Sequence, residues 1–419
     1  MYETAEQKEK CILISVEKDG TDSETNLNEL SLLIDTAGAV EAGRIIQKRD
    51  KIHSGTYMGK GKLDEIAEML EATEADAVVA DDELTASQQR NLAQRLNVKI
   101  LDRTMVILDI FARRAQTAEG KAQVELAQLK YSLSHLIGMR ASLSRQAGMS
   151  AHGGVGNRGP GEKKLELDRR HIRNRIDQLN KELVELRENR ALLRKKRAKQ
   201  DIPVVAIVGY TNAGKSTLLN ALTGADVLAE DKLFATLDTT TRKIELPDGG
   251  AEMLITDTVG FINKLPHHLI QAFRATLEET RFADILLHVV DASSPQSTQQ
   301  METVYETLKK LECMDKPIIT AFNKMDLPAE ITSDPRAAYV MPISAREGTN
   351  IPQLLEAIER VIDSMRSKIS VLIPYSHGAL VSQIHATCKV LSVENREDGT
   401  YMELYATEEV AAKTQPFFV

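Results

Sequence analysis

The apolar stretch Val204-Val-Ala-Ile-Val208 runs directly into Gly209-Tyr-Thr-Asn-Ala-Gly-Lys-Ser216, and a helix-forming sequence begins near Thr217. This order of strand, glycine loop and helix matches G-x-x-x-x-G-K-[ST] in the context that a phosphate-binding loop requires. Glycines let backbone N–H groups wrap around phosphates at a helix N-terminus, where the helix dipole also favours anions. We therefore predict that Lys215 contacts the β- and γ-phosphates and that the Ser216 hydroxyl ligates Mg²⁺.

A second apolar strand, Met253-Leu-Ile-Thr-Asp257-Thr-Val-Gly260, ends in D-x-x-G about forty residues further on. Asp257 is expected to hold Mg²⁺ through a water, and the Gly260 N–H to sense the γ-phosphate. The next residue is Phe261, where GTPases of the Ras type carry a water-orienting glutamine. A phenyl ring can neither donate nor accept a hydrogen bond, so the catalytic group stays unassigned. We expect slow intrinsic turnover and a water positioned by a partner or a backbone group.

The base is read by Asn323-Lys-Met-Asp326, which follows the apolar strand 317–322. The Asp326 carboxylate can accept hydrogen bonds from guanine N1–H and the 2-amino group, whereas adenine would leave that charge unpaired. Ser344-Ala-Arg346, after the strand 339–343, fits a loop that packs behind the base and donates a backbone N–H to guanine O6. Four motifs in this order, each at the C-terminal end of a predicted strand, predict a guanine-nucleotide site.

The composition is that of an ordinary globular protein of several domains. The chain has 419 residues, 42% of them hydrophobic and 27% charged, and its length favours two to four domains. We find no apolar run long enough for a transmembrane segment and no signal-peptide pattern. Cys11, Cys313 and Cys388 are scattered and have no metal-ligand spacing. These features predict a cytoplasmic protein with free thiols.

The net charge of −8 is unevenly placed. Residues 140–200 contain 17 Lys and Arg against 7 Asp and Glu, a local balance of +10 on an otherwise acidic chain. Leucine and isoleucine recur at spacings of three, four and seven in 121–147 and 162–199, which indicates two helices with a narrow apolar seam. Between them, Gly148–Gly161 holds six glycines. We predict an αα-hairpin with this loop as its exposed tip, and a basic face suited to a polyanion.

The fold class expected is α/β and multidomain. Residues 1–120 alternate predicted strands (11–16, 40–47, 77–80, 98–101) with predicted helices (28–35, 62–72, 86–96), which indicates an N-terminal α/β domain. The basic helical hairpin covers 121–200, and a Ras-like P-loop GTPase domain with a parallel sheet covered on both faces spans 201–365. A small α+β C-terminal module follows over 366–419, with a strand at 369–373, a helix at 378–386 and a hairpin turning at Asp398–Gly399.

A second glycine-rich segment, Gly55-Thr-Tyr-Met-Gly-Lys-Gly-Lys62, opens a predicted helix. A helix N-terminus can bind an anion, so this turn could hold ATP, contact RNA or only pack. It does not match a phosphate loop, because no Ser or Thr follows a Gly-Lys pair at the required place.

Beyond the GTPase motifs, the chain resembles the HflX family, ribosome-binding GTPases of the wider Obg-like group of translation-associated GTPases. The resemblance rests on residues 102–104, 108–114 and 119–128, which are similar to the family's segment entering the hairpin, and on Gly153-Gly-Val-Gly-Asn-Arg-Gly-Pro-Gly-Glu162 with Asp168-Arg-Arg170, similar to its glycine-rich tip. Lys163-Lys164 stands where Thr-Gln is the commonest family pattern, and Thr239 where a proline is familiar. Phe234-Ala-Thr-Leu-Asp238 is similar to the family's first switch.

The resemblance implies Thr236 as a magnesium ligand beside Ser216, although from the residues alone Thr239, Thr240 and Thr241 are equally candidates for sensing the γ-phosphate. The complete predicted GTP-binding set is Gly209, Tyr210, Thr211, Asn212, Ala213, Gly214, Lys215, Ser216, Phe234, Ala235, Thr236, Leu237, Asp238, Asp257, Thr258, Val259, Gly260, Asn323, Lys324, Met325, Asp326, Ser344, Ala345 and Arg346.

The resemblance also implies a partner, the large ribosomal subunit with its rRNA, and an activity, the splitting or rescue of stalled ribosomes under stress. We also expect the protein to be monomeric. Basic residues near the tip are the candidate RNA contacts: Arg158, Lys163, Lys164, Arg169, Arg170 and Arg173. Two other functions stay open: an RNA-remodelling or chaperone factor acting through the N-terminal domain, and a regulatory switch with a protein effector. The basic hairpin could also be a solvated face.

Overall fold

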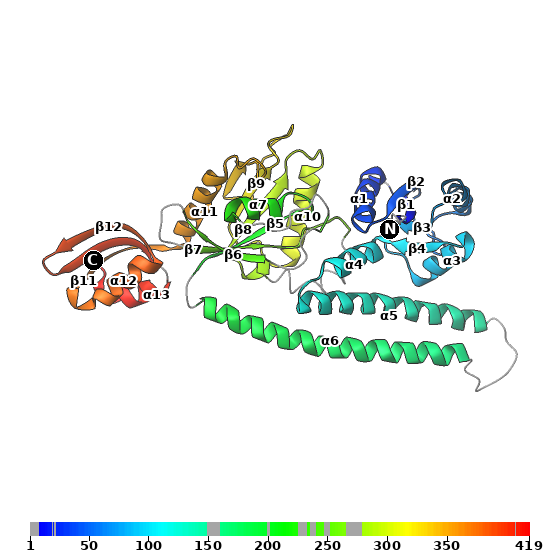
Figure 1. Cartoon of the computed structure of the whole chain (residues 1–419), viewed down its shortest axis with the longest axis horizontal. Coiled ribbons are helices and arrows are strands. Elements are labelled where there is room, and N and C mark those ends of the chain that lie inside the picture. The colour runs from blue at the N-terminus through cyan, green and yellow to red at the C-terminus, as the bar shows by residue number, and fades with distance from the viewer. Residues whose placement is uncertain are drawn as a thin grey trace, which may run out of the picture. The chain divides into compact units, whose positions relative to one another are not determined.

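The computed structural model (Figure 1) describes most of the chain. The described residues are 8–18, 20, 22–148, 160–198, 202–224, 233–234, 240–246, 252–264, 279–406 and 408–419. The chain forms two compact units. The first comprises Met1–Leu186 with Lys264–Phe273, and the second comprises Arg187–Asn263 with Arg274–Val419.

The first unit contains a four-stranded parallel sheet of order β2-β1-β3-β4. Its strands are β1 (Lys10–Glu17), β2 (Val40–Lys48), β3 (Ala77–Ala80) and β4 (Lys99–Asp102). All four predicted strands are present within one or two residues of the expected bounds. β1 has a neighbour on each side that comes later in the chain, so the order reverses between β1 and β3, and ligands of open parallel sheets bind at such points.

Helices pack in pairs around this sheet. Helix α1 (Ser23–Thr36) contacts α4 (Arg103–Arg114), and α2 (Lys60–Thr73) contacts α3 (Ala86–Leu96). Capping defines where two of them begin: the Asp22 carboxylate accepts from the Thr25 amide, and Thr85 and Gln88 form a reciprocal capping box. The core between α2, α3 and the sheet is apolar, with Ile14, Ile66 and Val78 fully buried. Helix α4 was not predicted as a helix.

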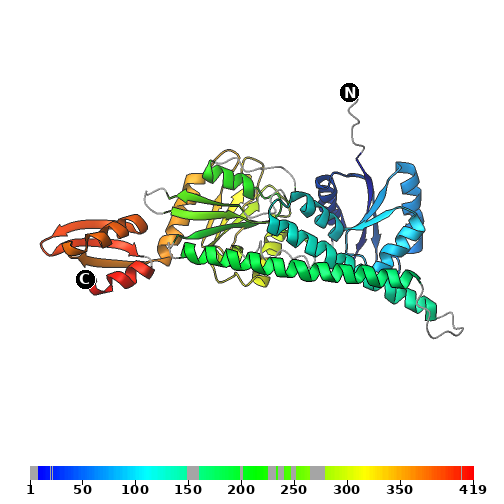
Figure 2. The same ribbon diagram turned by 60° about the horizontal axis from the view of Figure 1, so that its bottom comes forward.

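Two long helices follow, α5 (Ala118–Gly148) and α6 (Pro160–Ala198), and both views show them running side by side (Figures 1 and 2). Leu126 of α5 packs with Leu179 and Leu183 of α6, which are part of the predicted seam. Arg175 holds Glu125 by two hydrogen bonds of 2.7 Å across the pair. The predicted antiparallel helices are confirmed in this part; the glycine-rich tip, 149–159, lies outside the described residues.

The second unit contains a six-stranded sheet of order β10-β9-β8-β5-β7-β6. Its strands are β5 (Val204–Gly209), β6 (Thr240–Glu245), β7 (Glu252–Asp257), β8 (Ile285–Asp291), β9 (Ile318–Asn323) and β10 (Tyr339–Pro342). Helices α7 (Lys215–Thr223) and α11 (Ile351–Met365) share one apolar core with it, and α10 (Ser297–Lys310) contacts β5 and β8. The sheet was predicted to be parallel; β6 instead runs antiparallel to β7, because the two strands are consecutive along the chain and pair directly.

The end of the chain forms a three-stranded antiparallel sheet of order β11-β13-β12. The predicted strand, helix and hairpin are present as β11 (Ser367–Ile373), α12 (Gly378–Thr387), β12 (Lys389–Arg396) and β13 (Gly399–Ala406). Helix α13 (Glu408–Thr414) and the 3-10 turns η1 (Tyr375–His377) and η2 (Gln415–Phe417) were not predicted. The three cysteines are buried free thiols. Among the described residues, no helix is both long and apolar enough to span a bilayer.

Candidate guanine-nucleotide site

The phosphate loop joins β5 to α7 and is shaped by two left-handed residues, Asn212 (φ 61°) and Gly214 (φ 92°). A side chain at 214 would clash with Asn323, because a Cβ there would lie 2.2 Å from its Nδ2. The Asn323 amide in turn donates to the Ala213 carbonyl at 2.9 Å. Glycine is therefore required at 214 both by the backbone and by the close approach of Asn323.

Lys215, the first residue of α7, is 7% exposed, and its ammonium donates to the Tyr210 carbonyl at 2.7 Å. Burial lowers the pKa of Lys215 to about 8, and the negative charge of Asp257 partly opposes this shift. The phosphate loop therefore encloses a cation that an anionic ligand would stabilise. This is the behaviour predicted for the lysine that meets the β- and γ-phosphates.

Ser216, in the first turn of α7, lies beside Asp257, the last residue of β7. The Ser216 hydroxyl donates to the Asp257 carboxylate at 2.7 Å. Asp257 is fully buried, and the neighbouring Thr258 hydroxyl donates to the Ile207 carbonyl at 2.7 Å. In the described part of the chain, the buried Thr211 hydroxyl of the loop has no hydrogen-bond partner. Such an orphaned donor beside the lysine suits a polar ligand.

The residues predicted to read the base lie on two adjacent loops. Asn323 ends β9, and its side-chain oxygen accepts from the Ala345 amide at 2.9 Å, so one side chain joins the phosphate loop to the Ser344–Arg346 loop. The Ser344 hydroxyl donates to Asp326 at 2.8 Å and holds the pKa of that carboxyl below its usual range. Asp326 therefore stays ionised and oriented. The Ala345 amide, a candidate donor to guanine O6, is engaged by Asn323.

Phe261 sits beside the phosphate loop with its side chain 2% exposed. Its amide donates to the Gly209 carbonyl at 3.1 Å, and its carbonyl accepts from the Thr211 amide at 2.7 Å. The residue that replaces a water-orienting glutamine is thus buried and held by backbone bonds.

Comparison with known proteins agrees with this geometry. Three sequence profiles match in succession: "GTP-binding GTPase N-terminal" over residues 24–112, "GTP-binding GTPase Middle Region" over 114–197 and "50S ribosome-binding GTPase" over 204–324. A protein named GTPase HflX from Lacrimispora saccharolytica is 49% identical over 98% of this chain and 97% of its own length. The GTPase HflX of Caldanaerobacter subterraneus is 48% identical over 100% of this chain and 96% of its own. The chain belongs to the HflX GTPase family.

Membership of the HflX family makes the protein an enzyme that hydrolyses GTP. Among solved structures, a GTP-binding protein from Sulfolobus solfataricus in complex with GDP matches with a TM-score of 0.44 and 24% identity, over 85% of this chain and 99% of that one.

The first switch of this HflX protein is only partly described. Phe234 is buried in a left-handed conformation (φ 54°), while Ala235, Thr236, Leu237, Asp238 and Thr239 lie outside the described residues. Thr240 and Thr241 belong to β6, where Thr241 and Thr256 hydroxyls are 3.0 Å apart. The alternative γ-phosphate sensor Thr241 is therefore occupied by a cross-strand hydrogen bond.

The candidate RNA contacts differ in their surroundings. Arg170 and Arg173 are exposed on α6, whereas Arg169 is half-buried and pairs with Glu166 at 3.3 Å. Arg175, further along the same helix, is engaged by Glu125. Arg158 and the side chains of Lys163 and Lys164 lie outside the described residues.

The glycine-rich turn 55–62 is held by hydrogen bonds to other parts of the first unit. Tyr57 is fully buried in a left-handed conformation (φ 65°), and the Gly59 amide donates to the Gln47 side chain at 2.9 Å. A separate cavity of about 560 Å³ in the same unit is lined by α1, α4, α5 and the strand starts, and its lining includes no residue of this turn.

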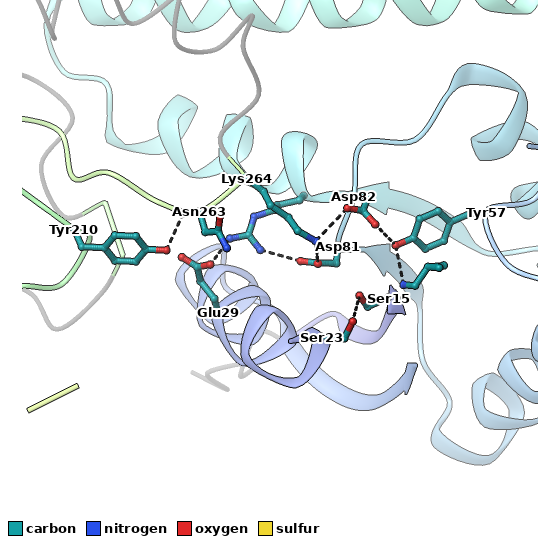
Figure 3. Close-up of polar contacts among 11 residues, drawn as sticks. Ser15, Ser23, Glu29, Tyr57, Asp81, Asp82, Tyr210, Asn263 and Lys264 are labelled. Atoms are coloured by element: carbon teal, nitrogen blue, oxygen red, sulfur yellow. Dashed lines mark hydrogen bonds and ion pairs between the residues drawn. The ribbon is translucent and has the colours of Figure 1, made fainter. Parts of the chain in front are cut away.

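Sequence reasoning missed a buried ion cluster at the carboxyl edge of the first sheet (Figure 3). Arg103, 2% exposed, donates to Asp81 at 2.9 Å and to Glu29 at 2.6 Å. Asp82 accepts from the Tyr57 hydroxyl at 2.7 Å, and burial raises the pKa of that phenol. Lys264 pairs with both Asp81 and Asp82. The sequence signal that could have indicated this cluster is the charged residues directly after two predicted strands, Asp81 and Asp82 after 77–80 and Arg103 after 98–101.

Proposed function

We propose that the protein is a monomeric, cytosolic, Mg²⁺-dependent GTPase that binds the large ribosomal subunit and uses the GTP cycle to split or rescue stalled ribosomes under stress. The observation that carries this is the match of residues 204–324 to a profile described as a 50S ribosome-binding GTPase. The hairpin tip would reach into the subunit toward the peptidyl-transferase region, and the second unit would hydrolyse the nucleotide.

The residues beside the phosphate loop fit a magnesium ion. Mg²⁺ takes oxygen ligands and is usually held by few protein groups together with substrate phosphates. The Ser216 hydroxyl would ligate it directly and Asp257 through a water; these two groups are 2.7 Å apart. Thr236 is the proposed second direct ligand. When bound, Mg²⁺ neutralises charge on the phosphates. Ser216→Ala should reduce the gain in GDP affinity that Mg²⁺ gives over EDTA, whereas Ser294→Ala in the same unit should leave it unchanged.

Intrinsic turnover is proposed to be slow, because the buried Phe261 cannot orient a water. The large subunit would then order or complete the catalytic group. The first measurement is GTP turnover with and without purified large subunits. A turnover that is already fast alone, and is unaffected by subunits, would overturn this part of the proposal.

The hairpin tip is proposed as the part that acts on the ribosome. Replacing 151–161 with a short Gly-Ser link should leave GTP binding and intrinsic turnover intact, because this loop lies outside the GTPase motifs. Ribosome-stimulated turnover or subunit splitting should fall tenfold or more, equivalent to about 1.4 kcal/mol. A loop variant that splits ribosomes and is stimulated like its parent would contradict this role.

Exposed arginines on α6 supply a sharper test of RNA contact. Arg170→Gln with Arg173→Gln should weaken ribosome association and flatten its salt dependence, because each phosphate contact releases counterions. The matched control is Lys309→Gln with Lys310→Gln, an equally exposed basic pair at the end of α10. Co-sedimentation with GTP and GDP, before and after RNase, separates the alternatives: activity on free RNA favours a remodelling factor, and association that survives RNase favours a protein effector.

A further inference from the structure

A carboxylate outside the guanine motifs lies between the phosphate loop and the predicted base-reading loop. Asp291 is the last residue of β8, and β8 lies between β5 and β9 in the sheet. The phosphate loop follows β5, and the motif that begins with Asn323 follows β9. A nucleotide that reaches both loops has to place its nucleoside across the end of β8, so Asp291 lies beside the path of the ligand.

The two carboxylate oxygens of Asp291 have different partners. Oδ1 accepts from the Ser293 amide at 3.0 Å and from the Ser293 hydroxyl at 2.6 Å, and these bonds close the turn after β8. Oδ2 pairs with the Lys324 ammonium at 2.7 Å. The Asp291 side chain is 16% exposed and that of Lys324 26%, so solvent screens this pair less than a fully exposed one. One oxygen therefore holds the turn, and the other holds the lysine of the base-reading motif.

The backbone around Lys324 is held independently of this ion pair. Lys324 adopts a left-handed conformation (φ 66°). The Asn323 carbonyl before it accepts from the Ala292 amide at 3.0 Å, and the Met325 amide after it donates to the Ile343 carbonyl at 3.2 Å. A lysine side chain has many rotamers, so with the backbone held, the partner of the ammonium determines where the side chain lies.

Lys324 also acts electrostatically on the residue predicted to read the base. The hydrogen bond from Ser344 is the main cause of the lowered pKa of Asp326, and the positive charge of Lys324 lowers it further. Asp326 is exposed, so its carboxylate is open to a cation that reaches it. A lysine released from Asp291 would therefore compete with guanine for Asp326.

We propose that Asp291 is a positioning residue for base recognition: it holds the Lys324 ammonium away from Asp326 and so keeps that carboxylate open to guanine. The ion pair orders the lysine before the nucleotide arrives, so binding does not bear that entropic cost. Without Oδ2 of Asp291, Lys324 pairs with Asp326, and the base has to displace it. The inference rests on the proposed nucleotide site, in which Asp326 reads the base.

Asp291→Asn separates the two oxygens. An amide keeps one oxygen for Ser293, while its NH₂ group cannot accept a hydrogen bond from an ammonium. Titration of the full chain with GDP, without ribosomes, should show a dissociation constant raised about 5–10-fold, which lies in the usual range of coupling between contacting residues. Loss of a negative charge would by itself strengthen the binding of an anionic nucleotide, so an unchanged or lower dissociation constant would overturn the proposal.

Lys324→Met shows whether the loss acts through the lysine. In this background, Asp291→Asn should weaken GDP binding no further, because no ammonium remains to compete for Asp326. An equal loss in both backgrounds would show that Asp291 is only structural and would overturn the proposal. Ser293→Ala is the matched control, because it removes one hydrogen bond of the turn and keeps the ion pair. It should bind GDP like the parent, and a loss as large as that of Asp291→Asn would assign the effect to the turn.

Asp326→Asn, tested with xanthosine diphosphate, separates this inference from the proposed site. An amide at position 326 has no charge to attract Lys324, so adding Asp291→Asn should leave the affinity for xanthosine diphosphate unchanged. A loss as large as the loss with GDP would overturn the positioning role while the site stands. If Asp326→Asn alone binds GDP like the parent, Asp326 does not read the base, and the inference fails together with the proposed site.

Discussion

Each of the two larger sheets of this chain has a buried cation at the carboxyl edge of its parallel strands, and the two cations have opposite surroundings. Lys215, beside β5, donates to a backbone carbonyl, and its pKa is lowered by burial to about 8. Arg103, after β4, is fixed between the carboxylates of Asp81 and Glu29. The first cation is available to an anionic ligand, while the second is neutralised by the protein itself.

The difference teaches that parallel topology places polar groups at the carboxyl edge but does not decide what they bind. In the GTPase sheet, the glycine loop after β5 encloses a lysine whose ammonium donates to a backbone carbonyl. In the first sheet, the same kind of edge carries paired charges from Glu29 of α1, Asp81 and Asp82 after β3, Arg103 of α4 and Lys264. We therefore expect only the second edge to bind a nucleotide, and changes at the two edges should have different consequences.

The largest effect is expected where the ligand-binding edge reads the base. Asp326→Asn should weaken GTP binding and favour xanthosine triphosphate, because an amide can donate to the oxygen that replaces the guanine amino group. A site built to pair a specific polar edge can discriminate by about 10⁴-fold, so the GTP-to-XTP preference should change by orders of magnitude. Competition binding measures it. The matched control, the exposed Asp315→Asn, should leave the preference unchanged; an unchanged preference in Asp326→Asn would remove Asp326 from the base site.

The second-largest effect is expected when Lys215, the cation available to an anionic ligand, is removed. Lys215→Ala should lose tight GTP binding while the fold stays intact, since two hydrogen bonds to charged phosphate oxygens contribute about 3–6 kcal/mol together. Equilibrium titration with a fluorescent GTP analogue checks this. Lys62→Ala, in the glycine-rich turn of the first unit, is the control and should bind like the parent. If Lys62→Ala lost ATP binding that the parent shows, the first unit would have a nucleotide site and the comparison would fail.

Replacing Arg103, the cation paired with carboxylates, should lower the stability of the first unit and leave GTP binding unchanged. Arg103→Met leaves Asp81 completely buried beside one fewer partner, and breaking a buried pair costs about 3–5 kcal/mol. Hydrogen exchange of the β1 and β3 amides should show that loss, with GTP affinity little changed. Arg113→Met is the control: Arg113 is 59% exposed and pairs with Asp109 within α4, so its loss should cost less than about 1 kcal/mol. Equal protection from hydrogen exchange in both variants would show that Arg103 stabilises the first unit no more than an exposed arginine does.

The two edges were also unequally predictable from sequence. The guanine motifs could be proposed from sequence because each is a short contiguous pattern after an apolar strand. Their binding of the nucleotide stays a prediction, while the hydrogen bonds from Asn323 to Ala213 and Ala345 show that these loops are adjacent. The ion cluster joins Arg103 to Glu29 over 74 residues and Lys264 to Asp81 over 183, and no local pattern reports such pairs. Helix α4 was missed because its sequence was interpreted only through its resemblance to the HflX family, although Asp102 accepts from the Met105 amide at its start.

The smallest expected effect is on the pH dependence of GTP affinity, which tests whether the Lys215 ammonium lacks a charged partner until the nucleotide binds. Its pKa of about 8 belongs to the nucleotide-free protein, and phosphates should raise it toward or above its ordinary value. Binding above pH 8 must then take up a proton, so GTP affinity should fall by up to tenfold, about 1.4 kcal/mol, per pH unit from pH 8 upward and stay flat below about pH 7. Calorimetry in buffers of different ionisation enthalpy measures both the affinity and the proton uptake.

Lys215→Arg is the control, because a guanidinium stays protonated throughout this pH range. Titration of the guanine base of GTP affects both proteins equally. The difference between the two proteins in the slope of GTP affinity against pH gives the contribution of Lys215 protonation. Identical slopes would mean that Lys215 is already fully charged in the free protein, and that its burial beside Tyr210 does not distinguish it from Arg103.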